Sequence, residues 1–258
     1  MAKIIAIANQ KGGVGKTTTS VNLGASLAAA KRRVLLIDLD PQGNATMGSG
    51  IDKNNLAASA YDVLMNETSL MDALVFVEHS KYTLLPGNSD LTGAEVGLLD
   101  EFARELRLRH SLDSVRDDYD YILIDCPPTL SMLTINALVA ADVVMIPMQC
   151  EYYALEGLSA LLETVEKIRK ILNPKLHVDG LLRTMYDARN NLSNQVSAQL
   201  VKHFGNKVYG TVIPRNVRLA EAPSHGLPVL LYDKNCSGAL AYLALAGELL
   251  RRDRDEVA

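Results

Sequence analysis

Short apolar runs alternate along this sequence with longer segments of helical periodicity, and this alternation restricts the fold more than any other feature. Strands are expected at Lys3–Ala8, Arg33–Asp38, Tyr121–Asp125, Asp142–Pro147, Leu181–Tyr186 and Val208–Ile213, and helices at Lys16–Ala30, Leu98–Arg116, Ser131–Ala140, Leu155–Leu172, Ser193–Phe204 and Ser237–Arg252. Strands that alternate with helices form βαβ units and a mostly parallel sheet. Because several strands are apolar nearly throughout, helices should cover both faces of the sheet. The sequence therefore predicts an α/β fold, a doubly wound sheet in a single domain over residues 1–258, with peripheral helices and loops between Gly43 and Leu85.

The composition excludes several classes of protein. The three cysteines, Cys126, Cys150 and Cys236, are odd in number and lack CxxC spacing, so we expect reduced thiols in a cytoplasmic protein. No apolar run approaches the ~20 residues of a membrane span, and we expect no signal peptide. The formal net charge of -4 excludes a coat of positive charge, but it leaves room for a local basic face.

A glycine-rich segment between a strand and a helix predicts a phosphate-binding loop. Residues 11–18 read KGGVGKTT and follow the apolar run Ile4–Ala8. The standard pattern G-x-x-x-x-G-K-[ST] is not met, because its first glycine would fall on Gln10. Glycines let backbone N–H groups turn toward phosphate oxygens, and Lys16 should reach the β- and γ-phosphates. The Thr17 hydroxyl should bind Mg²⁺. The ATP contacts expected from this loop are Gly12, Gly13, Val14, Gly15, Lys16, Thr17 and Thr18.

Aspartates end two of the expected strands. Asp38 and Asp40 follow the run at 34–37, and Asp125 ends the run at 121–124. Ligands of open α/β sheets bind at the carboxyl ends of the strands, so these acids should lie beside the phosphate loop. Asp125 is typical of a carboxylate that holds Mg²⁺ through a water or through Thr17. Taken alone, the pair Asp40-Pro41 could equally form a turn.

The loop KGGVGKTT and the string DLDPQGNAT at 38–46 resemble two motifs of the ParA/MinD superfamily, and within it those of the ParA/Soj proteins that partition chromosomes and plasmids. The resemblance implies that Lys11 crosses to the ATP of a partner subunit, so that two nucleotides bridge a homodimer. It also implies that Asp40 orients the attacking water, while Asp38 supports the metal and the loop. A lysine inserted in trans can offset the repulsion between two triphosphates. Considered in isolation, Lys11 could be a solvated loop residue.

The later part of the chain is more basic than the rest. Residues 174–234 contain eight Lys or Arg and four Asp or Glu, which is weak support for contact with a phosphate backbone. Most single basic residues are simply solvated. By resemblance to ParA/Soj proteins, Arg189 and Arg218 are the expected contacts to non-specific double-stranded DNA. The string IPRNVRLAEAPS at 213–224 lies near the adenine in that family, so Pro214 and Asn216 are expected on the base side of ATP.

Other functions explain less of the sequence. A MinD-type membrane-associated regulator would share Lys11, Lys16 and Asp40, but it normally ends in an amphipathic basic helix, whereas residues 249–258 read LLRRDRDEVA. A nitrogenase-like reductase would need cluster-binding cysteines from both subunits, and Cys126 offers at most one. A metabolic P-loop kinase, or a DNA-binding module without catalysis, leaves the extra lysine and the paired aspartates unexplained.

The motifs and the resemblance together predict a nucleotide switch. ATP and Mg²⁺ are the expected cofactors, with Thr17, Asp38 and Asp125 around the metal and Lys11, Lys16 and Asp40 in catalysis. We expect an ATP-bound homodimer that binds DNA without sequence preference, a weak intrinsic ATPase, and a centromere-binding partner of the ParB/Spo0J type that stimulates hydrolysis. The expected location is the cytoplasm and nucleoid, with no membrane partner.

Overall fold

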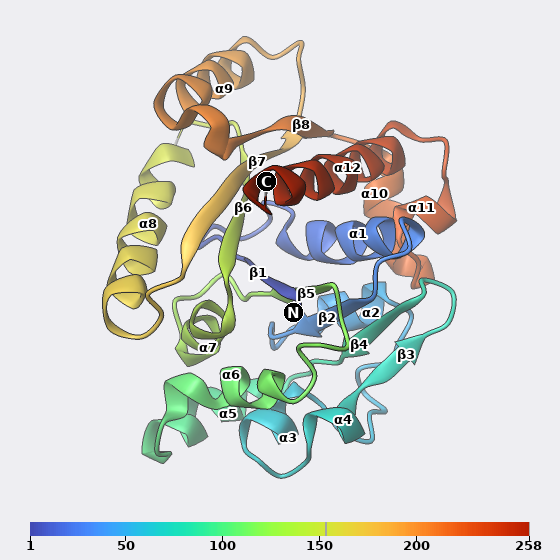
Figure 1. The fold of residues 1–258 in the computed structure, drawn as a ribbon. Coiled ribbons are helices and arrows are strands. Elements are labelled where there is room, and N and C mark those ends of the chain that lie inside the picture. Colours follow the sequence, from blue (N-terminus) through green and yellow to red (C-terminus); the bar gives the residue numbers. More distant parts are fainter. Residues whose placement is uncertain (153, 258) are drawn as a thin grey trace.

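Eight strands form one sheet in the computed structural model, which describes residues 1–152 and 154–257 (Figure 1). The strands are β1 (Lys3–Ile7), β2 (Val34–Asp38), β3 (Val75–Val77), β4 (Tyr82–Leu85), β5 (Tyr121–Asp125), β6 (Val143–Gln149), β7 (His177–Tyr186) and β8 (Val208–Pro214). Their order is β3-β4-β2-β5-β1-β6-β7-β8, and β3 with β4 is the one antiparallel pair among these neighbours. The predicted α/β class with a mostly parallel sheet is confirmed.

Strand register brings the predicted acids to one edge of the sheet. Ile7 at the end of β1 pairs with Asp125 at the end of β5. Asp38 at the end of β2 pairs with the same Asp125 from the other side. Because all three strands are parallel, the loops that follow them leave from one edge. The phosphate loop after β1 therefore lies next to the end of β5, and the end of β2 lies one strand further along the same edge.

Helices cover both faces of the sheet. They are α1 (Lys16–Ala29), α2 (Asn44–Gly48), α3 (Ala60–Leu64), α4 (Leu70–Ala73), α5 (Leu91–Gly97), α6 (Arg107–Asp113), α7 (Met132–Ala140), α8 (Ala154–Ile171), α9 (Asn191–Phe204), α10 (Val217–Glu221), α11 (Val229–Tyr232) and α12 (Ser237–Val257), with 3-10 turns η1 (Leu98–Asp100), η2 (Arg104–Leu106), η3 (Gly205–Lys207) and η4 (Ala222–His225). In Figure 1, α1 and α12 lie together on one face, and α7 lies across the sheet from them.

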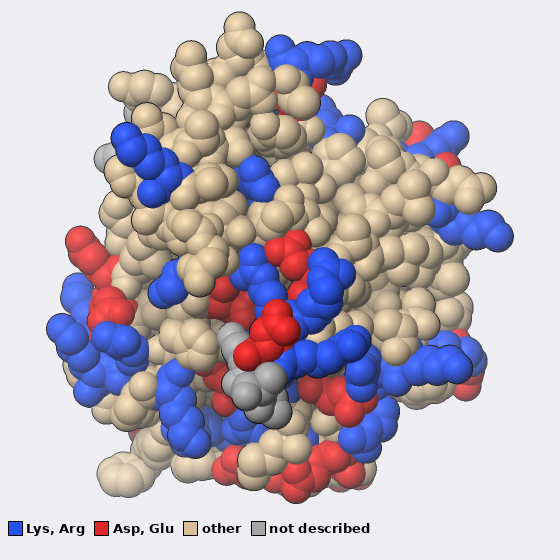
Figure 2. All heavy atoms as spheres, turned by 45° about the horizontal axis from the view of Figure 1, so that its top comes forward, with Lys and Arg blue, Asp and Glu red and all other residues tan. Residues whose placement is uncertain are grey.

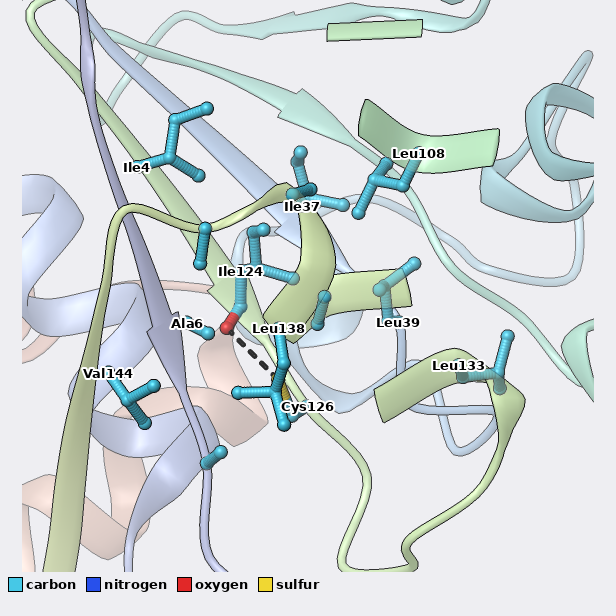
Figure 3. Close-up of a cluster of buried hydrophobic side chains, with 14 of the residues drawn as sticks. Ile4, Ala6, Ile37, Leu39, Leu108, Ile124, Cys126, Leu133, Leu138 and Val144 are labelled. Carbon is cyan, nitrogen blue, oxygen red and sulfur yellow. Dashed lines mark hydrogen bonds between the residues drawn. The ribbon is translucent and has the colours of Figure 1, made fainter. Parts of the chain in front are cut away.

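Each face of the sheet has its own hydrophobic core. Alternate residues of each strand point to opposite faces, and β1 shows this because Ile4 and Ala6 belong to one buried cluster while Ile5 and Ile7 belong to the other. Figure 3 shows part of the first cluster, in which Cys126 lies among buried aliphatic side chains. Cys126 is fully buried, as expected for a thiol that fills space and takes no part in chemistry.

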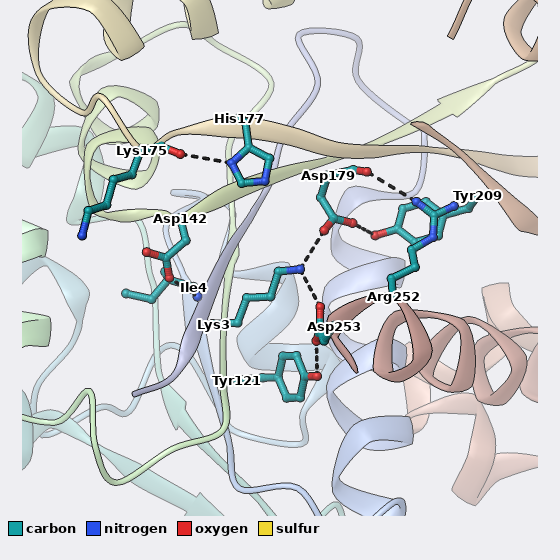
Figure 4. Close-up of polar contacts among 10 residues, drawn as sticks. All are labelled: Lys3, Ile4, Tyr121, Asp142, Lys175, His177, Asp179, Tyr209, Arg252 and Asp253. Carbon is teal, nitrogen blue, oxygen red and sulfur yellow. Dashed lines mark hydrogen bonds and ion pairs between the residues drawn. The ribbon is translucent and has the colours of Figure 1, made fainter. Parts of the chain in front are cut away.

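The opposite edge of the sheet is closed by an ionic network (Figure 4). The Lys3 ammonium lies 2.9 Å from a carboxylate oxygen of Asp179 on β7 and 2.6 Å from one of Asp253 on α12. The Tyr121 hydroxyl donates to Asp253, and the Tyr209 hydroxyl donates to Asp179. Burial acts to lower the pKa of Lys3, but the two carboxylates outweigh it and raise that pKa. This network joins α12 to the strands β1, β5, β7 and β8 at the edge opposite the predicted phosphate loop.

Two expectations about the elements were wrong. The stretch expected to hold only peripheral helices and loops contributes β4, which pairs in parallel with β2, and its hairpin partner β3. The single helix expected over Leu98–Arg116 is broken into η1, η2 and α6, since Ala103 has a left-handed φ of 53°. The buried Asn136 side chain stabilises the break: it donates to the Arg104 carbonyl and accepts from the Leu108 amide.

Candidate nucleotide site

The phosphate loop curls around an open cavity at the carboxyl edge of the sheet. Gly13 and Gly15 have φ values of 72° and 88°, a region that disfavours any residue with a Cβ. Helix α1 begins at Lys16, directly after Gly15. The cavity has a volume of about 320 Å³ and is lined by Gly12, Gly13, Gly15, Lys16, Thr17, Thr18, Asp40, Asn44, Pro128 and Met185. Helix-terminal and glycine N–H groups at such a position form an anion site.

Lys16 is held at the bottom of this loop. Its side chain is buried, and its ammonium donates to the Lys11 carbonyl at 3.2 Å. Burial lowers the pKa of Lys16, and the neighbouring Asp125 carboxylate opposes that effect. Val14 is buried and does not line the cavity, so its expected ATP contact can come only from its backbone.

Asp125 accepts two hydroxyl hydrogen bonds from the first turn and a half of α1. Thr17 Oγ1 donates to one carboxylate oxygen at 2.7 Å, and Ser20 Oγ donates to the other at 2.8 Å. Burial, and next the nearby Asp38 carboxylate, raise the pKa of Asp125. A hydroxyl and a carboxylate side by side at the mouth of a phosphate loop are the oxygen ligands that Mg²⁺ prefers. The Thr17 hydroxyl and the Asp125 carboxylate are therefore a donor set that fits the metal.

Asp38 and Asp40 differ in their surroundings. Asp38 is fully buried, and one carboxylate oxygen accepts from both the amide and the hydroxyl of Thr46, each at 2.7 Å. Its other oxygen accepts from the Asp40 amide at 3.2 Å. Burial raises the pKa of Asp38 despite these hydrogen bonds. Asp40 instead lines the cavity, and one of its oxygens accepts from the Gln42 amide at 3.0 Å. The geometry gives Asp38 the loop contacts and places Asp40 at the cavity.

A second, more apolar cavity adjoins the phosphate loop. It has a volume of about 170 Å³ and is lined by Gly15, Thr18, Thr184, Met185, Ile213, Pro214, Arg215, Asn216, Leu219, Ala220 and Tyr242. Gly15 and Thr18 therefore line both cavities, so the two lie side by side. Pro214 and Asn216 line the second one, where a base would lie if the phosphates occupied the loop. Asn216 also caps α10, because its Oδ1 accepts from the Arg218 amide at 2.9 Å.

Lys11 lies at the head of the loop and contacts its own chain. Its ammonium lies 2.6 Å from a carboxylate oxygen of Glu151, just after β6, and both side chains are about half exposed, at 41% and 50%. Its amide donates to Asn9 Oδ1 at 2.9 Å. The structure thus places Lys11 outside the phosphate cavity of its own subunit.

The two arginines expected to bind DNA are both on the surface and both paired. The Arg189 guanidinium donates to both carboxylate oxygens of Asp187 at 2.9 Å, while 91% of its side chain is exposed. Arg218 donates to Glu221 at 2.8 Å and lies 3.5 Å from a carboxylate oxygen of Asp233. The arginine bond is the main reason why the pKa of Asp187 is low, at about 2.

Several residues at the site were not expected from the sequence. Asn44 and Thr46 belong to the string DLDPQGNAT, so the motif could have indicated them. Ser20 lies one turn after Thr17, and that spacing alone could have placed it on the same face of α1. Met185 and Tyr242 approach the cavities from β7 and α12, and nothing in their local sequence marks them.

Matches with known proteins agree with this geometry. A family model described as an AAA domain, AAA_31, matches residues 2–178. The sporulation initiation inhibitor protein Soj of Bacillus subtilis strain 168 is 56% identical over 249 residues, which are 96% of this chain and 98% of Soj. The chromosome partitioning protein ParA of Caulobacter vibrioides strain NA1000 is 53% identical over 258 residues, which are 99% of this chain and 97% of that protein. The chain belongs to the ParA/Soj family of partitioning ATPases.

Solved structures resemble this ParA/Soj chain over nearly its whole length. A protein of Mycobacterium smegmatis described as cobyrinic acid a,c-diamide synthase, with bound ADP and magnesium, is 39% identical with a TM-score of 0.87, over 98% of this chain and 96% of that one. The cell division ATPase MinD of Pyrococcus furiosus is 26% identical with a TM-score of 0.80, over 97% and 99%. Among the described residues, no helix is long and apolar enough to cross a membrane.

Proposed function

We propose that this ParA/Soj chain is an ATP-dependent DNA-partitioning switch that uses Mg²⁺. The observation that carries the proposal is the arrangement at one sheet edge: a glycine-rich loop with Lys16, a Thr17–Asp125 pair 2.7 Å apart, and Asp40 on the same cavity. That combination supplies a phosphate cradle, a metal site and a carboxylate at the attack position. Relatives described as chromosome partitioning proteins support partitioning as the use of this chemistry.

Each residue has a distinct task in hydrolysis. The loop amides and Lys16 bind and neutralise the phosphates, Thr17 binds the metal, and Asp125 orients Thr17 and the metal's water shell. Mg²⁺ supplies charge that offsets the negative charge growing on the transferred phosphoryl group. Asp40 holds the attacking water. With one carboxylate and no neighbouring base on the cavity among the described residues, we expect slow intrinsic turnover.

The position of Lys11 supports a proposed homodimer. Since its ammonium lies outside its own phosphate cavity, we propose that it leaves Glu151 and reaches the ATP of a second subunit. Two subunits then close over two nucleotides, and the lysine offsets their mutual repulsion. Hydrolysis removes the γ-phosphate charge that the lysine binds, and the dimer separates.

DNA binding is proposed for the surface that carries Arg189 and Arg218. Figure 2 shows one face of the molecule, on which basic side chains stand in separate groups and many lie beside acidic ones. Contacts from such basic groups to phosphates require positive charge but no base readout. A dimer doubles the number of contacts, which makes DNA affinity depend on ATP. We propose that a centromere-binding partner of the ParB/Spo0J type stimulates hydrolysis and so releases the dimer, in the cytoplasm and on the nucleoid.

The first test is binding to a random-sequence DNA duplex at two salt concentrations, with ATP or a slowly hydrolysed analogue, with ADP, and without nucleotide. Binding that requires the triphosphate and weakens steeply with salt supports the proposal. Equal DNA affinity with ATP, with ADP and without nucleotide would contradict the switch. Absence of DNA binding in every state, together with binding to anionic lipid vesicles, would favour the MinD-type alternative.

A further inference from the structure

The carboxyl end of β7 touches the phosphate loop. Thr184 is buried, and its hydroxyl donates to the Val14 carbonyl at 2.7 Å across 170 positions of sequence. A Cβ built on Gly15 would lie 3.8 Å from the Thr184 Cβ and Cγ2, an ordinary van der Waals distance, so the Thr184 side chain lies directly beside Gly15.

That bond sets the direction of a peptide group. In a planar trans peptide the C=O and the following N–H point in opposite directions. When Thr184 holds the Val14 carbonyl toward β7, the Gly15 N–H must point away from β7, and Gly15 lines the phosphate cavity. We propose that Thr184 is a positioning residue of the nucleotide site: its hydroxyl fixes the Val14–Gly15 peptide so that the Gly15 N–H faces the phosphates.

The neighbouring strand supplies a second, weaker anchor of the same kind. Gln149 at the end of β6 pairs with Thr184 in the β6–β7 register. Its side-chain amide donates to the Gly13 carbonyl at 3.5 Å, the long limit of a hydrogen bond. Consecutive carbonyls of the loop are thus held by two residues that are neighbours across the sheet. The peptide that follows Gly13 is oriented in the same sense as the one that follows Val14.

Fixing the loop in advance matters because Gly15 is in a left-handed conformation, at φ 88°. A glycine loop without anchors would have to be ordered by the nucleotide, and that ordering would cost binding free energy. Thr184 lines the apolar cavity and not the phosphate cavity, so in this proposal it acts on the phosphates through the loop backbone. The inference rests on the proposed function only in that the cavity takes a nucleotide polyphosphate.

The test compares Thr184→Val, which keeps the shape and loses the hydroxyl, with Thr184→Ser, which keeps the hydroxyl. Dissociation constants for Mg·ADP and Mg·ATP are measured by calorimetry on the folded full-length chain. One lost hydrogen bond predicts a roughly three- to tenfold weaker affinity for Thr184→Val, while Thr184→Ser stays within about twofold of the parent. If the valine variant does not fold, Thr184→Ala gives the same comparison without a methyl group against the carbonyl.

Ser26→Ala is the matched control. The Ser26 hydroxyl is also buried and also donates to a backbone carbonyl at 2.7 Å, but it lies near the far end of α1. Its loss should leave both dissociation constants unchanged. Equal nucleotide affinity in parent and Thr184→Val, or equal weakening in Thr184→Ser, would overturn the role of the hydroxyl. Failure of the parent chain to bind nucleotide would instead refute the proposed function.

Discussion

Replacing Asp187 with asparagine should strengthen DNA binding. In the structure both Asp187 oxygens are taken by Arg189, so the proposed DNA contact must first give up its carboxylate partner. Asparagine keeps the size of the side chain and an acceptor oxygen for the Arg189 amide, which now donates to Asp187 at 3.0 Å. It removes the charge that competes with phosphate.

The size of the effect follows from the exposure of this pair. Arg189 is 91% exposed, so solvent screens the interaction. Exposed ion pairs of this kind correspond to about a two- to fivefold change in an equilibrium constant. Two subunits act in the proposed dimer at separate sites, so the effects should multiply to about four- to twentyfivefold. The dependence on salt should also become steeper, since a carboxylate no longer repels the phosphates. In a plot of log binding constant against log salt concentration, the slope should change by at most about 0.9 per subunit.

The assay is fluorescence-anisotropy titration of a random duplex with ATP at several salt concentrations. Glu78→Gln is the matched control, because Glu78 also pairs with an exposed cation, Lys81 at 2.9 Å, in the hairpin at the other end of the sheet. It changes the net charge equally. Unchanged affinity of Asp187→Asn would refute the competition between carboxylate and phosphate. An equal gain in Glu78→Gln would show that net charge alone is responsible.

Other substitutions test the hydrolytic and dimer steps. Asp40→Ala should keep ATP affinity within about threefold and lower turnover at least about a hundredfold, with the dimer remaining on DNA; parental phosphate release would exclude Asp40 from the reaction. Glu151→Gln should free Lys11 and lower the ATP concentration for half-dimerisation about two- to fivefold in sedimentation experiments, whereas an unchanged midpoint would show that the pair does not restrain Lys11. Burial raises the pKa of Asp125 from 3.8 to about 8, so the folded chain binds its proton more tightly than the unfolded chain and stability falls as pH rises through that window. Asp125→Asn should flatten the fall in Tm between pH 6 and 8 without nucleotide. It should also abolish the extra stabilisation that Mg²⁺ gives with ATP. If Tm fell with pH as steeply in this variant as in the parent, another group would be responsible for the titration.

The sequence could predict the central part of the fold because that part is locally encoded. Strands buried on both faces read as continuous apolar runs, and all six expected strands are present. The convergence of Asp38 and Asp125 beside the phosphate loop followed from one rule about parallel sheets, without knowledge of the strand order. The cavity-lining position of Asp40 followed from the same rule, and those of Lys16 and Thr17 followed from the loop motif.

What the sequence concealed depends on tertiary contacts. Strand β4 is only four residues long, and its place beside β2 is decided by pairing rather than by its own pattern. The broken helix depends on Asn136, a buried amide that offers the backbone alternative hydrogen bonds. The Lys11–Glu151 pair joins residues 140 positions apart, and no spacing rule reaches that far.

The three cations proposed to act between molecules are all paired within their own chain, and this has a consequence for the switch. Lys11 pairs with Glu151, Arg189 with Asp187 and Arg218 with Glu221. In the proposed switch each of these cations would exchange its carboxylate for a phosphate of a partner subunit or of DNA. Such an exchange conserves the number of charge-assisted hydrogen bonds, so each contact adds little net affinity. Affinity must then come from released counterions and from the doubling of contacts in the dimer. In the proposed switch, hydrolysis ends the dimer and so removes that doubling at once, and weak individual contacts would then let the protein leave DNA.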